Sequence, residues 1–221
     1  MSSLAATLMH KLHQKNVYAG FQYEGIAEDI HGGGGNPIFE MLIEAARPQL
    51  VIEVGSWKGS SALRMASLMQ ERGIDGAIIC VDTWLGGLDH ISDPMTPDWD
   101  IGRYRQHGYP MLYFQFLANV MHAGMHEFIV PFPNTSAIAA RWLLKHEIQA
   151  DLVYIDASHD EADVYNDMVD YWKTLRPGGV MFGDDWSPYW PGVVNAATRF
   201  SSERGLALHT EDVNWLLIKP A

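Results

Sequence analysis

Three acidic side chains lie where two apolar runs of the sequence end. Asp156 closes the run 151–156, and Asp184 and Asp185 follow the run 180–183. If these runs are neighbouring parallel strands, the three carboxylates meet at one edge of a sheet and repel one another unless a cation lies between them. Hard oxygen ligands suit Mg²⁺, which keeps positions open for water or substrate oxygens. The sequence therefore predicts a metal site of three acids; alternatively, the Asp184-Asp185 pair only begins a loop and caps the next helix.

A histidine follows the first of these acids at close range. His159 lies three residues after Asp156, which places it at the mouth of the same cleft. An imidazole titrates near neutral pH, which suits a general base that takes a proton from a substrate hydroxyl. We therefore interpret His159 and Asp156 as the candidate catalytic residues. The alternative is that His159 is a partly exposed loop residue, one of ten histidines in the chain.

The first apolar run, 50–55, ends in a turn that contains two glycines. Gly55 and Gly59 let the backbone turn tightly and approach a ligand closely. The helix after the turn directs its free N–H groups toward that ligand and favours an anionic group. A dinucleotide site would have a third glycine where Trp57 stands. A pyrophosphate is therefore disfavoured, and a smaller ligand that carries a carboxylate fits better.

The second apolar run, 77–82, ends in an acid. Asp82 is well placed to accept hydrogen bonds from both hydroxyls of a ribose bound at the neighbouring glycine turn. The alternative is a helix cap or a solvated loop acid. The nearby glycines favour the ribose.

These side chains come together only if the strands that carry them end at the same edge of a sheet. The sequence has the pattern of such a sheet. Short apolar runs alternate with amphipathic stretches, as in a mostly parallel sheet with helices on both faces. The runs predicted as parallel strands are 50–55, 77–82, 126–132, 151–156 and 180–183. Two closing strands, 206–210 and 214–218, are too close together for a crossover helix and must form an antiparallel hairpin. The sequence therefore predicts an α/β fold, a Rossmann-like, doubly wound, seven-stranded and mostly parallel sheet with a C-terminal antiparallel hairpin.

Turn-forming residues mark the predicted end of the helix that precedes the fifth strand. Pro177-Gly178-Gly179 should stop this helix and turn the chain into the strand at 180–183. The apolar face of the helix consists of Val164, Met168, Tyr171 and Leu175.

Two segments interrupt the alternation. Residues 83–108 have no periodicity and contain several aromatic residues, prolines and aspartates, which is typical of a lid or binding loop. Residues 1–48 form a helical and lid segment that includes the glycine-rich loop 32–35, to which the sequence assigns no role. We predict one catalytic domain, 49–221, with 83–108 as an insertion.

Bulk composition excludes several classes of partner. The 221-residue chain has 27 acidic and 15 basic side chains and a net charge of −12, which repels a phosphate backbone and argues against nucleic acid. No run approaches the ~20 apolar residues of a membrane span. Cys80 is the only cysteine, which fits a reducing compartment, so we expect a cytoplasmic protein. An apolar N-terminal helix with Leu4, Leu8 and Leu12 could pack on its own domain or on a second copy in a homo-oligomer.

From Leu50 to the C-terminus, the sequence resembles the class I methyltransferases that bind S-adenosylmethionine (SAM). It is most similar to the macrocin O-methyltransferase-like group, metal-dependent enzymes that methylate sugars of macrolide and aminocoumarin antibiotics. The phrases that carry the resemblance are Tyr154-Ile155-Asp156-Ala157-Ser158-His159, Gly183-Asp184-Asp185-Trp186 and Leu175-Arg176-Pro177-Gly178-Gly179.

The resemblance implies a role for each matching residue. The three acids would hold Mg²⁺, and His159 would be the base. Asp82 would hold the ribose of SAM, and Ser136 would contact its adenine side. The residues that would line the methionine part are Glu53, Gly55, Ser56 and Gly59.

The sequence therefore predicts a SAM-dependent, Mg²⁺-assisted O-methyltransferase that acts on a hydroxylated small molecule of the sugar or natural-product type. Mg²⁺ would lower the pKa of a substrate hydroxyl, and the base would take its proton as the oxygen attacks the methyl group. Two alternatives stay open: a hydroxylase that shares the fold, and a non-catalytic SAM-binding module. The lid and the N-terminal segment match the group only loosely, so the acceptor is left open.

Overall fold

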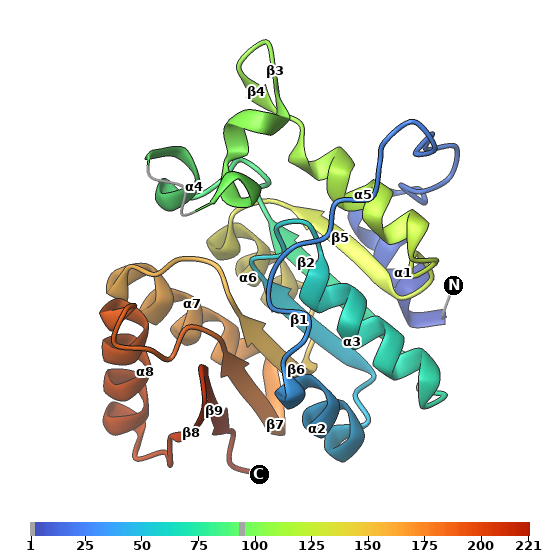
Figure 1. Cartoon of the computed structure of the whole chain (residues 1–221). Coiled ribbons are helices and arrows are strands. Elements are labelled where there is room, and N and C mark those ends of the chain that lie inside the picture. Colours follow the sequence, from blue (N-terminus) through green and yellow to red (C-terminus); the bar gives the residue numbers. More distant parts are fainter. Residues whose placement is uncertain (1–2, 93–95) are drawn as a thin grey trace.

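The computed structural model describes residues 3–92 and 96–221 (Figure 1). Residues 1–2 of the predicted N-terminal segment and residues 93–95 of the predicted lid lie outside the described part. None of the described helices combines the length and the hydropathy that crossing a bilayer requires.

One seven-stranded sheet forms the centre of the molecule. Its strands are β1 (Leu50–Val54), β2 (Ala77–Asp82), β5 (Ile129–Pro133), β6 (Ala150–Ile155), β7 (Leu175–Gly183), β8 (His209–Glu211) and β9 (Asn214–Ile218), and their order is β5-β2-β1-β6-β7-β9-β8. The first five in this order pair in parallel, whereas β9 is antiparallel to β7 and β8 is antiparallel to β9. The predicted fold class and the closing hairpin are confirmed. The strand order reverses between β1 and β6, which is where such sheets bind ligands.

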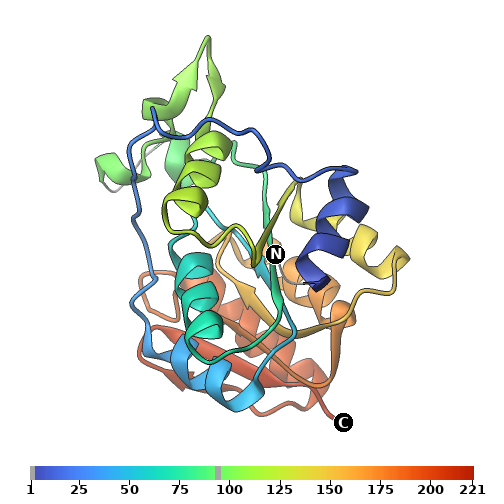
Figure 2. The same cartoon turned by 90° about the vertical axis from the view of Figure 1, so that its right-hand side faces the viewer.

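Helices cover both faces of the sheet. The helices are α1 (Ser3–His13), α2 (Pro37–Ala46), α3 (Ser60–Glu71), α4 (Leu88–Ser92), α5 (Leu112–His122), α6 (Ser136–Lys145), α7 (Glu161–Thr174) and α8 (Pro191–Arg204). Figures 1 and 2 show α2, α3 and α5 on one face and α6, α7 and α8 on the other. Because both faces are covered, every residue of β1 is buried, as expected for a parallel strand in this position. This rigid centre holds the ends of the strands in place.

The N-terminal helix packs on its own domain. Leu8 of α1 is 3% exposed and belongs to the main hydrophobic core, while Leu4 and Leu12 are partly buried against the same core. The helix lies beside the edge strand β5, where the Nε2 of His13 lies 2.7 Å from the carbonyl oxygen of Pro131. Of the two partners considered for this apolar face, the structure shows the chain's own core.

The predicted end of α7 is wrong. The helix stops at Thr174, and Leu175 already pairs with Ala150 in β7, so Leu175 does not belong to the apolar face of the helix. The register between β6 and β7 shifts between Ala150 and Leu152. This irregularity lets the strand absorb Pro177, which has no N–H group to donate, and β7 therefore begins five residues before the predicted strand.

Two other strand boundaries also differ from the prediction. β5 begins at Ile129 because residues 126–128 form a turn, in which the N–H of Phe128 donates to the carbonyl of Met125. β8 begins at His209, since the preceding residues close the end of α8 through a bond from the Leu206 N–H to the Ser201 carbonyl. Local capping thus shortens both strands at their starts.

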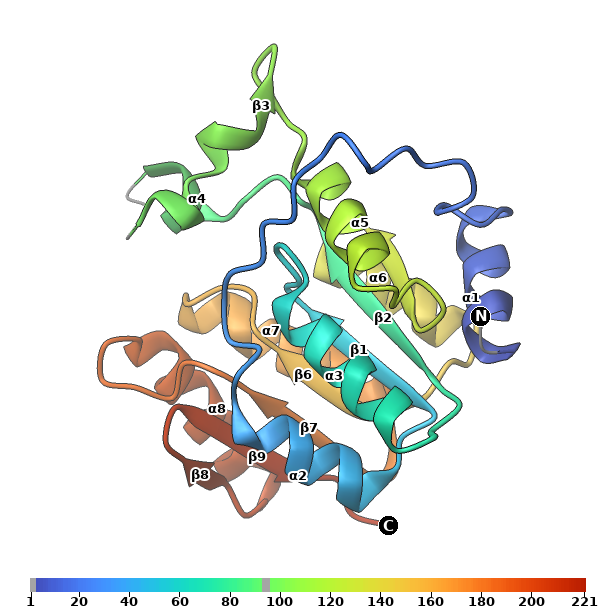
Figure 3. The same ribbon diagram turned by 45° about the vertical axis from the view of Figure 1, so that its right-hand side comes forward.

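The predicted lid contains more regular structure than its sequence indicates. After α4 come the 3₁₀ helices η1 (Pro97–Trp99) and η2 (Ile101–Tyr104), and then a small antiparallel hairpin of β3 (Arg105–Gln106) and β4 (Tyr109–Pro110). Trp84 is 1% exposed, and Ile101 is fully buried. These two side chains anchor the lid to the domain, and Figure 3 shows it above the carboxyl ends of the central strands.

A crossing segment, residues 14–36, connects α1 to α2 and passes over α5 (Figure 3). Side chains of α5 hold it in place: Gln115 donates to the Ala27 carbonyl at 2.8 Å, and the Nε2 of His122 lies 2.8 Å from the Ile26 carbonyl. The crossing segment therefore lies on the domain along a fixed path.

Candidate active site

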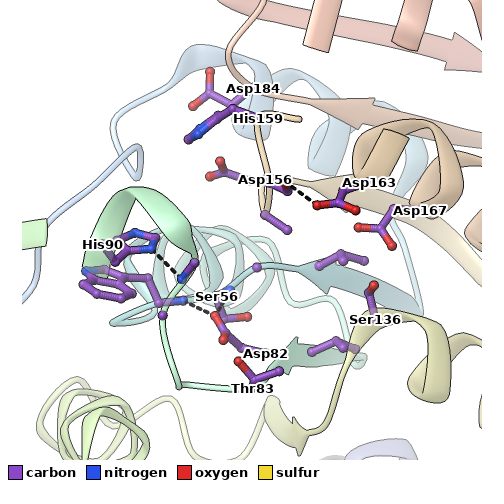
Figure 4. A pocket seen from close by; sticks show the side chains of 18 of the residues that line it. Ser56, Asp82, Thr83, His90, Ser136, Asp156, His159, Asp163, Asp167 and Asp184 are labelled. Carbon is purple, nitrogen blue, oxygen red and sulfur yellow. Dashed lines mark hydrogen bonds between the residues drawn. The ribbon is translucent and has the colours of Figure 1, made fainter. Parts of the chain in front are cut away.

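A cavity of about 710 Å³ opens at the carboxyl ends of β1, β2, β5, β6 and β7 (Figure 4). Its volume is in the range of small-molecule sites. The predicted site residues that line it are Gly55, Ser56, Asp82, Ser136, Asp156, His159, Asp184 and Asp185. Glu53 and Gly59 are not among the lining residues. The cavity thus brings together eight of the ten predicted residues.

Gly55 allows β1 and β6 to approach each other closely where the cavity begins. Its φ is +87°, and a Cβ atom there would lie 2.0 Å from the carbonyl oxygen of Asp156. No side chain is compatible with this contact. Trp57 also adopts a left-handed conformation, with φ +45°. The chain turns sharply here and directs the start of α3 toward the cavity.

Glu53 supports the turn from below. It is fully buried, and its two carboxylate oxygens accept hydrogen bonds from the hydroxyls of Ser56 (2.5 Å) and Ser61 (2.6 Å). Burial raises the pKa of Glu53 to about 7, although both serine hydroxyls oppose the rise. Glu53 is thus placed to hold the shape of the turn.

Asp82 binds the backbone of two segments. Its Oδ2 accepts hydrogen bonds from the N–H groups of Ser56 and Trp57, each at 2.9 Å, and its Oδ1 accepts one from Trp84 at 2.7 Å. The carboxylate therefore joins the glycine turn to the first residues of the lid, while still lining the cavity.

A buried lysine connects the same turn to the crossing segment and the lid. Lys58 is fully buried, and its Nζ lies 3.0 Å from an oxygen of Asp29 in the crossing segment. The other oxygen of Asp29 accepts a hydrogen bond from the hydroxyl of Tyr104 in η2. Asn119 of α5 donates to the backbone carbonyls of both Asp29 (2.8 Å) and Lys58 (2.9 Å). Four segments of the chain thus meet at one ion pair.

The glycine-rich loop closes one side of the cavity. Gly32 and Gly33 line the cavity, and a Cβ atom on Gly34 would lie 2.5 Å from the hydroxyl oxygen of Ser60 at the start of α3. The small residues therefore let the crossing segment pass close to the helix that follows the glycine turn.

The three predicted acids face one another across the ends of β6 and β7. Burial raises the pKa of Asp156 well above its ordinary value, and the charges of Asp185 and Asp184 raise it further. The Tyr154 hydroxyl donates to Asp156 at 3.0 Å. Burial also raises the pKa of Asp184. Burial and mutual repulsion therefore destabilise the ionised form of these carboxylates, and a nearby cation would stabilise it.

The arrangement expected of a metal site is not formed. Within the described residues, no three Asp, Glu, His or Cys side chains are grouped so that they could hold a metal ion. Asp185 instead pairs with His159, whose Nε2 lies 3.0 Å from its Oδ2. The donor types suit a hard cation, but the side chains do not converge on one point.

His159 is held by two carboxylates and an indole. Its Nδ1 lies 2.9 Å from the Oδ2 of Asp89 in α4, and its ring stacks on Trp190 with centroids 3.6 Å apart. Burial lowers the pKa of His159, but the pairs with Asp185 and Asp89 outweigh this and raise it to about 9. The imidazole is therefore protonated at neutral pH, and it links the lid to the end of β7.

Two lid residues that line the cavity, Asp89 and His90, were not predicted from the sequence. His90 of α4 stacks on Trp57 with ring centroids 4.1 Å apart, and Trp99 lies beside both rings. Asp89, the lid partner of His159, also lines the cavity. The aromatic and acidic composition of the lid was the only signal for them in the sequence.

The charge of the cavity wall is one-sided. Among the described residues that line it there are eight aspartates and neither lysine nor arginine; the aspartates are Asp82, Asp89, Asp156, Asp163, Asp167, Asp170, Asp184 and Asp185. Such a wall attracts cations and repels anions.

Comparison with known proteins identifies the family of the part of the chain that carries this site. The sequence matches the protein family described as methyltransferase domain over residues 52–186, a stretch that includes the glycine turn and the three acids. No curated protein sequence matches the chain.

Solved structures share the fold, among them the following three. One is the O-methyltransferase from Bacillus cereus in complex with SAH, with a TM-score of 0.58 and 16% identity over 96% of this chain and 91% of that one. Another is TomG from Streptomyces achromogenes, an O-methyltransferase involved in tomaymycin synthesis and solved with SAM. Its TM-score is 0.59, and its identity is 12% over 100% of this chain and 91% of TomG. The calicheamicin methyltransferase CalS11 has a TM-score of 0.57 and 16% identity over 82% of this chain and 77% of CalS11.

Proposed function

The chain belongs to the methyltransferase domain family, and from this premise we propose that it transfers the methyl group of SAM to a hydroxyl of a small molecule. The observation that carries the proposal is the cavity at the strand ends, where a glycine turn opens into a wall rich in carboxylates. A sulfonium cation is complementary to such a wall. The structural likeness to O-methyltransferases solved with SAM or SAH supports oxygen as the accepting atom.

The order of the strands determines how SAM would lie across the carboxyl end of the sheet. The methionine part would lie at the turn of Gly55 and Ser56, where the start of α3 offers N–H groups to its carboxylate. The ribose would lie beside Asp82 at the end of β2, and the adenine near Ser136, which follows β5. Glu53 and Gly59 would act by shaping the turn.

The chemistry requires an acceptor oxygen in line with the methyl group. SAM supplies an activated methyl group; the oxygen bonds to its carbon as the carbon–sulfur bond breaks, and the bonding electrons stay on sulfur. The protein must orient both molecules and remove the hydroxyl proton. Because His159 is paired with two carboxylates and already protonated at neutral pH, it can accept this proton only after it loses a carboxylate partner or above about pH 9.

We propose further that Mg²⁺ binds at Asp156, Asp184 and Asp185. Bound there, the ion would lower the pKa of an acceptor hydroxyl. Support comes from the oxygen donors of the three acids and from the repulsion of Asp156 by Asp185 and Asp184, which adds to the effect of burial on the pKa of Asp156 and which a cation would relieve. Titration of MgCl₂ into the SAH complex should raise the unfolding temperature of the wild type and leave Asp184→Asn unchanged. Equal responses of the two proteins would remove the metal from the proposal.

The charge of the wall restricts the acceptor. The described lining residues include no lysine or arginine, and the protonated His159 is already paired with Asp89 and Asp185, so a phosphate, a carboxylate or a coenzyme A ester would find no free cationic partner. We therefore propose a neutral or amine-bearing hydroxylated acceptor. The aromatic rings of Trp57, Trp99 and Trp190 offer flat apolar surfaces for a sugar or phenol ring. TomG is involved in tomaymycin synthesis and CalS11 is a calicheamicin methyltransferase, which supports the natural-product type.

Calorimetric titration with SAM and with SAH, with and without Mg²⁺, tests the proposal. We expect saturable binding of both ligands with one site per chain. Methyl transfer from labelled SAM to a panel of hydroxylated sugars and phenols then distinguishes an enzyme from a non-catalytic module. The absence of SAM and SAH binding would refute the proposal, and turnover that requires oxygen and iron would identify a hydroxylase instead.

A further inference from the structure

One aspartate in the cavity wall has no function in the proposed transfer. Asp167 lies on α7, is 8% exposed, and still lines the cavity. It was not predicted as a site residue. Figure 4 shows it beside Ser136 at one end of the pocket, whereas Asp184, His159 and His90 lie toward the other parts. Asp167 therefore lies at a different end of the pocket from Asp184 and His159.

The neighbouring acids on the same face of α7 have other partners. Asp163, one turn earlier, accepts a hydrogen bond from the hydroxyl of Ser158 at 3.0 Å. Asp170, almost one turn later, pairs with the Nζ of Lys173 at 2.8 Å. Among the residues that the structure describes, the hydroxyl of Ser136 is the one side-chain hydrogen-bond partner that lowers the pKa of Asp167, and no cation is among the groups that shift this pKa.

A nearly buried carboxylate without a cation is destabilising unless other donors reach it. Burial raises the pKa of Asp167 to about 6, against the opposing effect of Ser136, so at pH 8 the group is ionised. A carboxylate has acceptor positions for several hydrogen bonds, and one hydroxyl fills one of them. The remaining positions are available to a ligand that presents N–H groups at this end of the cavity.

We propose that Asp167 accepts a hydrogen bond from the exocyclic amino group of the adenine ring and makes the site selective for adenine over purines that lack this donor. The inference rests on the proposed function, because it uses the placement of the adenine near Ser136. α6 and α7 pack against each other, and the two residues face the same end of the cavity. An amino group donates two hydrogen bonds, whereas the oxygen at the same position of hypoxanthine would be repelled by the carboxylate.

Calorimetry with three ligands tests the inference on the wild type alone, at pH 8. The ligands are SAH, its hypoxanthine analogue S-inosylhomocysteine, and the analogue whose purine carries only hydrogen at position 6. A hydrogen bond to a charged group corresponds to a loss of about 10- to 100-fold in affinity when the donor is removed. We expect SAH to bind most tightly, the unsubstituted purine next, and the hypoxanthine analogue most weakly. Equal affinities for all three would overturn the inference.

Two variants assign the selectivity to the residue. Asp167→Asn keeps the shape and replaces one acceptor oxygen by a donor, so the preference for SAH over the hypoxanthine analogue should fall to near one or reverse. Asp170→Asn removes the same charge from the same helix face and should keep the wild-type preference. An unchanged preference in Asp167→Asn would overturn the assignment. If the wild type binds none of the ligands, the proposed function fails instead.

Discussion

The buried carboxyl of Glu53 makes the stability of the protein depend on pH in a defined way. Burial raises its pKa from 4.5 to about 7. The folded state therefore prefers the protonated form, and the favourable contribution is complete below about pH 4.5 and is lost as the pH rises through about 7. At about 1.4 kcal/mol per pH unit, the difference between the two values corresponds to about 3 kcal/mol. Glu53→Gln, which keeps the shape without the charge, should lack this dependence.

Urea unfolding of the wild type and Glu53→Gln, followed by circular dichroism, measures the effect. Because solubility is lowest near the isoelectric point of about 5.1, the useful range is pH 5.5 to 8.5. Over this range the stability of the wild type relative to the variant should fall by about 2 kcal/mol and become constant above about pH 8. Acids distant from Glu53 contribute equally to both proteins and cancel in the difference, whereas Asp82 and Asp156, which interact with Glu53, add a smaller change of their own. A difference that stays flat, or that rises with pH, would refute the argument.

Three further substitutions test the turn and its supports. Gly55→Ala, whose Cβ would lie 2.0 Å from the Asp156 carbonyl oxygen, should abolish SAH binding in calorimetry; binding close to that of the wild type would contradict the geometry. Lys58→Met removes the lysine from Asp29, whose carboxylate keeps its contacts with His31 and Tyr104, and should lower the unfolding free energy by about 2–3 kcal/mol, less than for a fully buried pair because Asp29 is 22% exposed; a loss below about 0.5 kcal/mol in urea unfolding would show that the pair is unimportant. Asp82→Asn cannot preserve all three backbone hydrogen bonds and should both weaken SAH binding and speed proteolysis of the lid; an unchanged proteolysis rate would show that this carboxylate does not hold the lid.

The sequence predicted the parts of the structure that depend on local pattern. Apolar runs located the central strands, and the glycine turn followed from two small residues at the end of the first run. The short spacing between the last two strands required the antiparallel hairpin. The end of α7 was missed because Pro177 within a strand is uncommon, and only the pairing of Leu175 with Ala150 shows that a bulge accommodates it.

The site was predicted less completely because its contacts join distant parts of the chain. The pair of Asp89 and His159 spans 70 residues and begins in a lid without periodicity. Asp82 was expected to face a ribose, and its backbone hydrogen bonds to Ser56 and Trp57 depend on a turn conformation that residue types do not specify. Asp167 lies three residues after Val164 and four before Tyr171, at the buried face of α7, but an aspartate is an uncommon residue at a buried position, and its burial was not predicted.

The ion pair of Lys58 and Asp29 limits how this protein can be redesigned. Acceptor specificity would usually be altered by exchanging the lid for that of a relative. Here Tyr104 of the lid donates to Asp29, and Asn119 of α5 donates to the backbone carbonyls of both members of the pair. A transplanted lid without a matching hydroxyl would therefore leave the Asp29 carboxylate with one hydrogen bond fewer next to the glycine turn. A working chimera would have to inherit the crossing segment, α5 and the lid as one block.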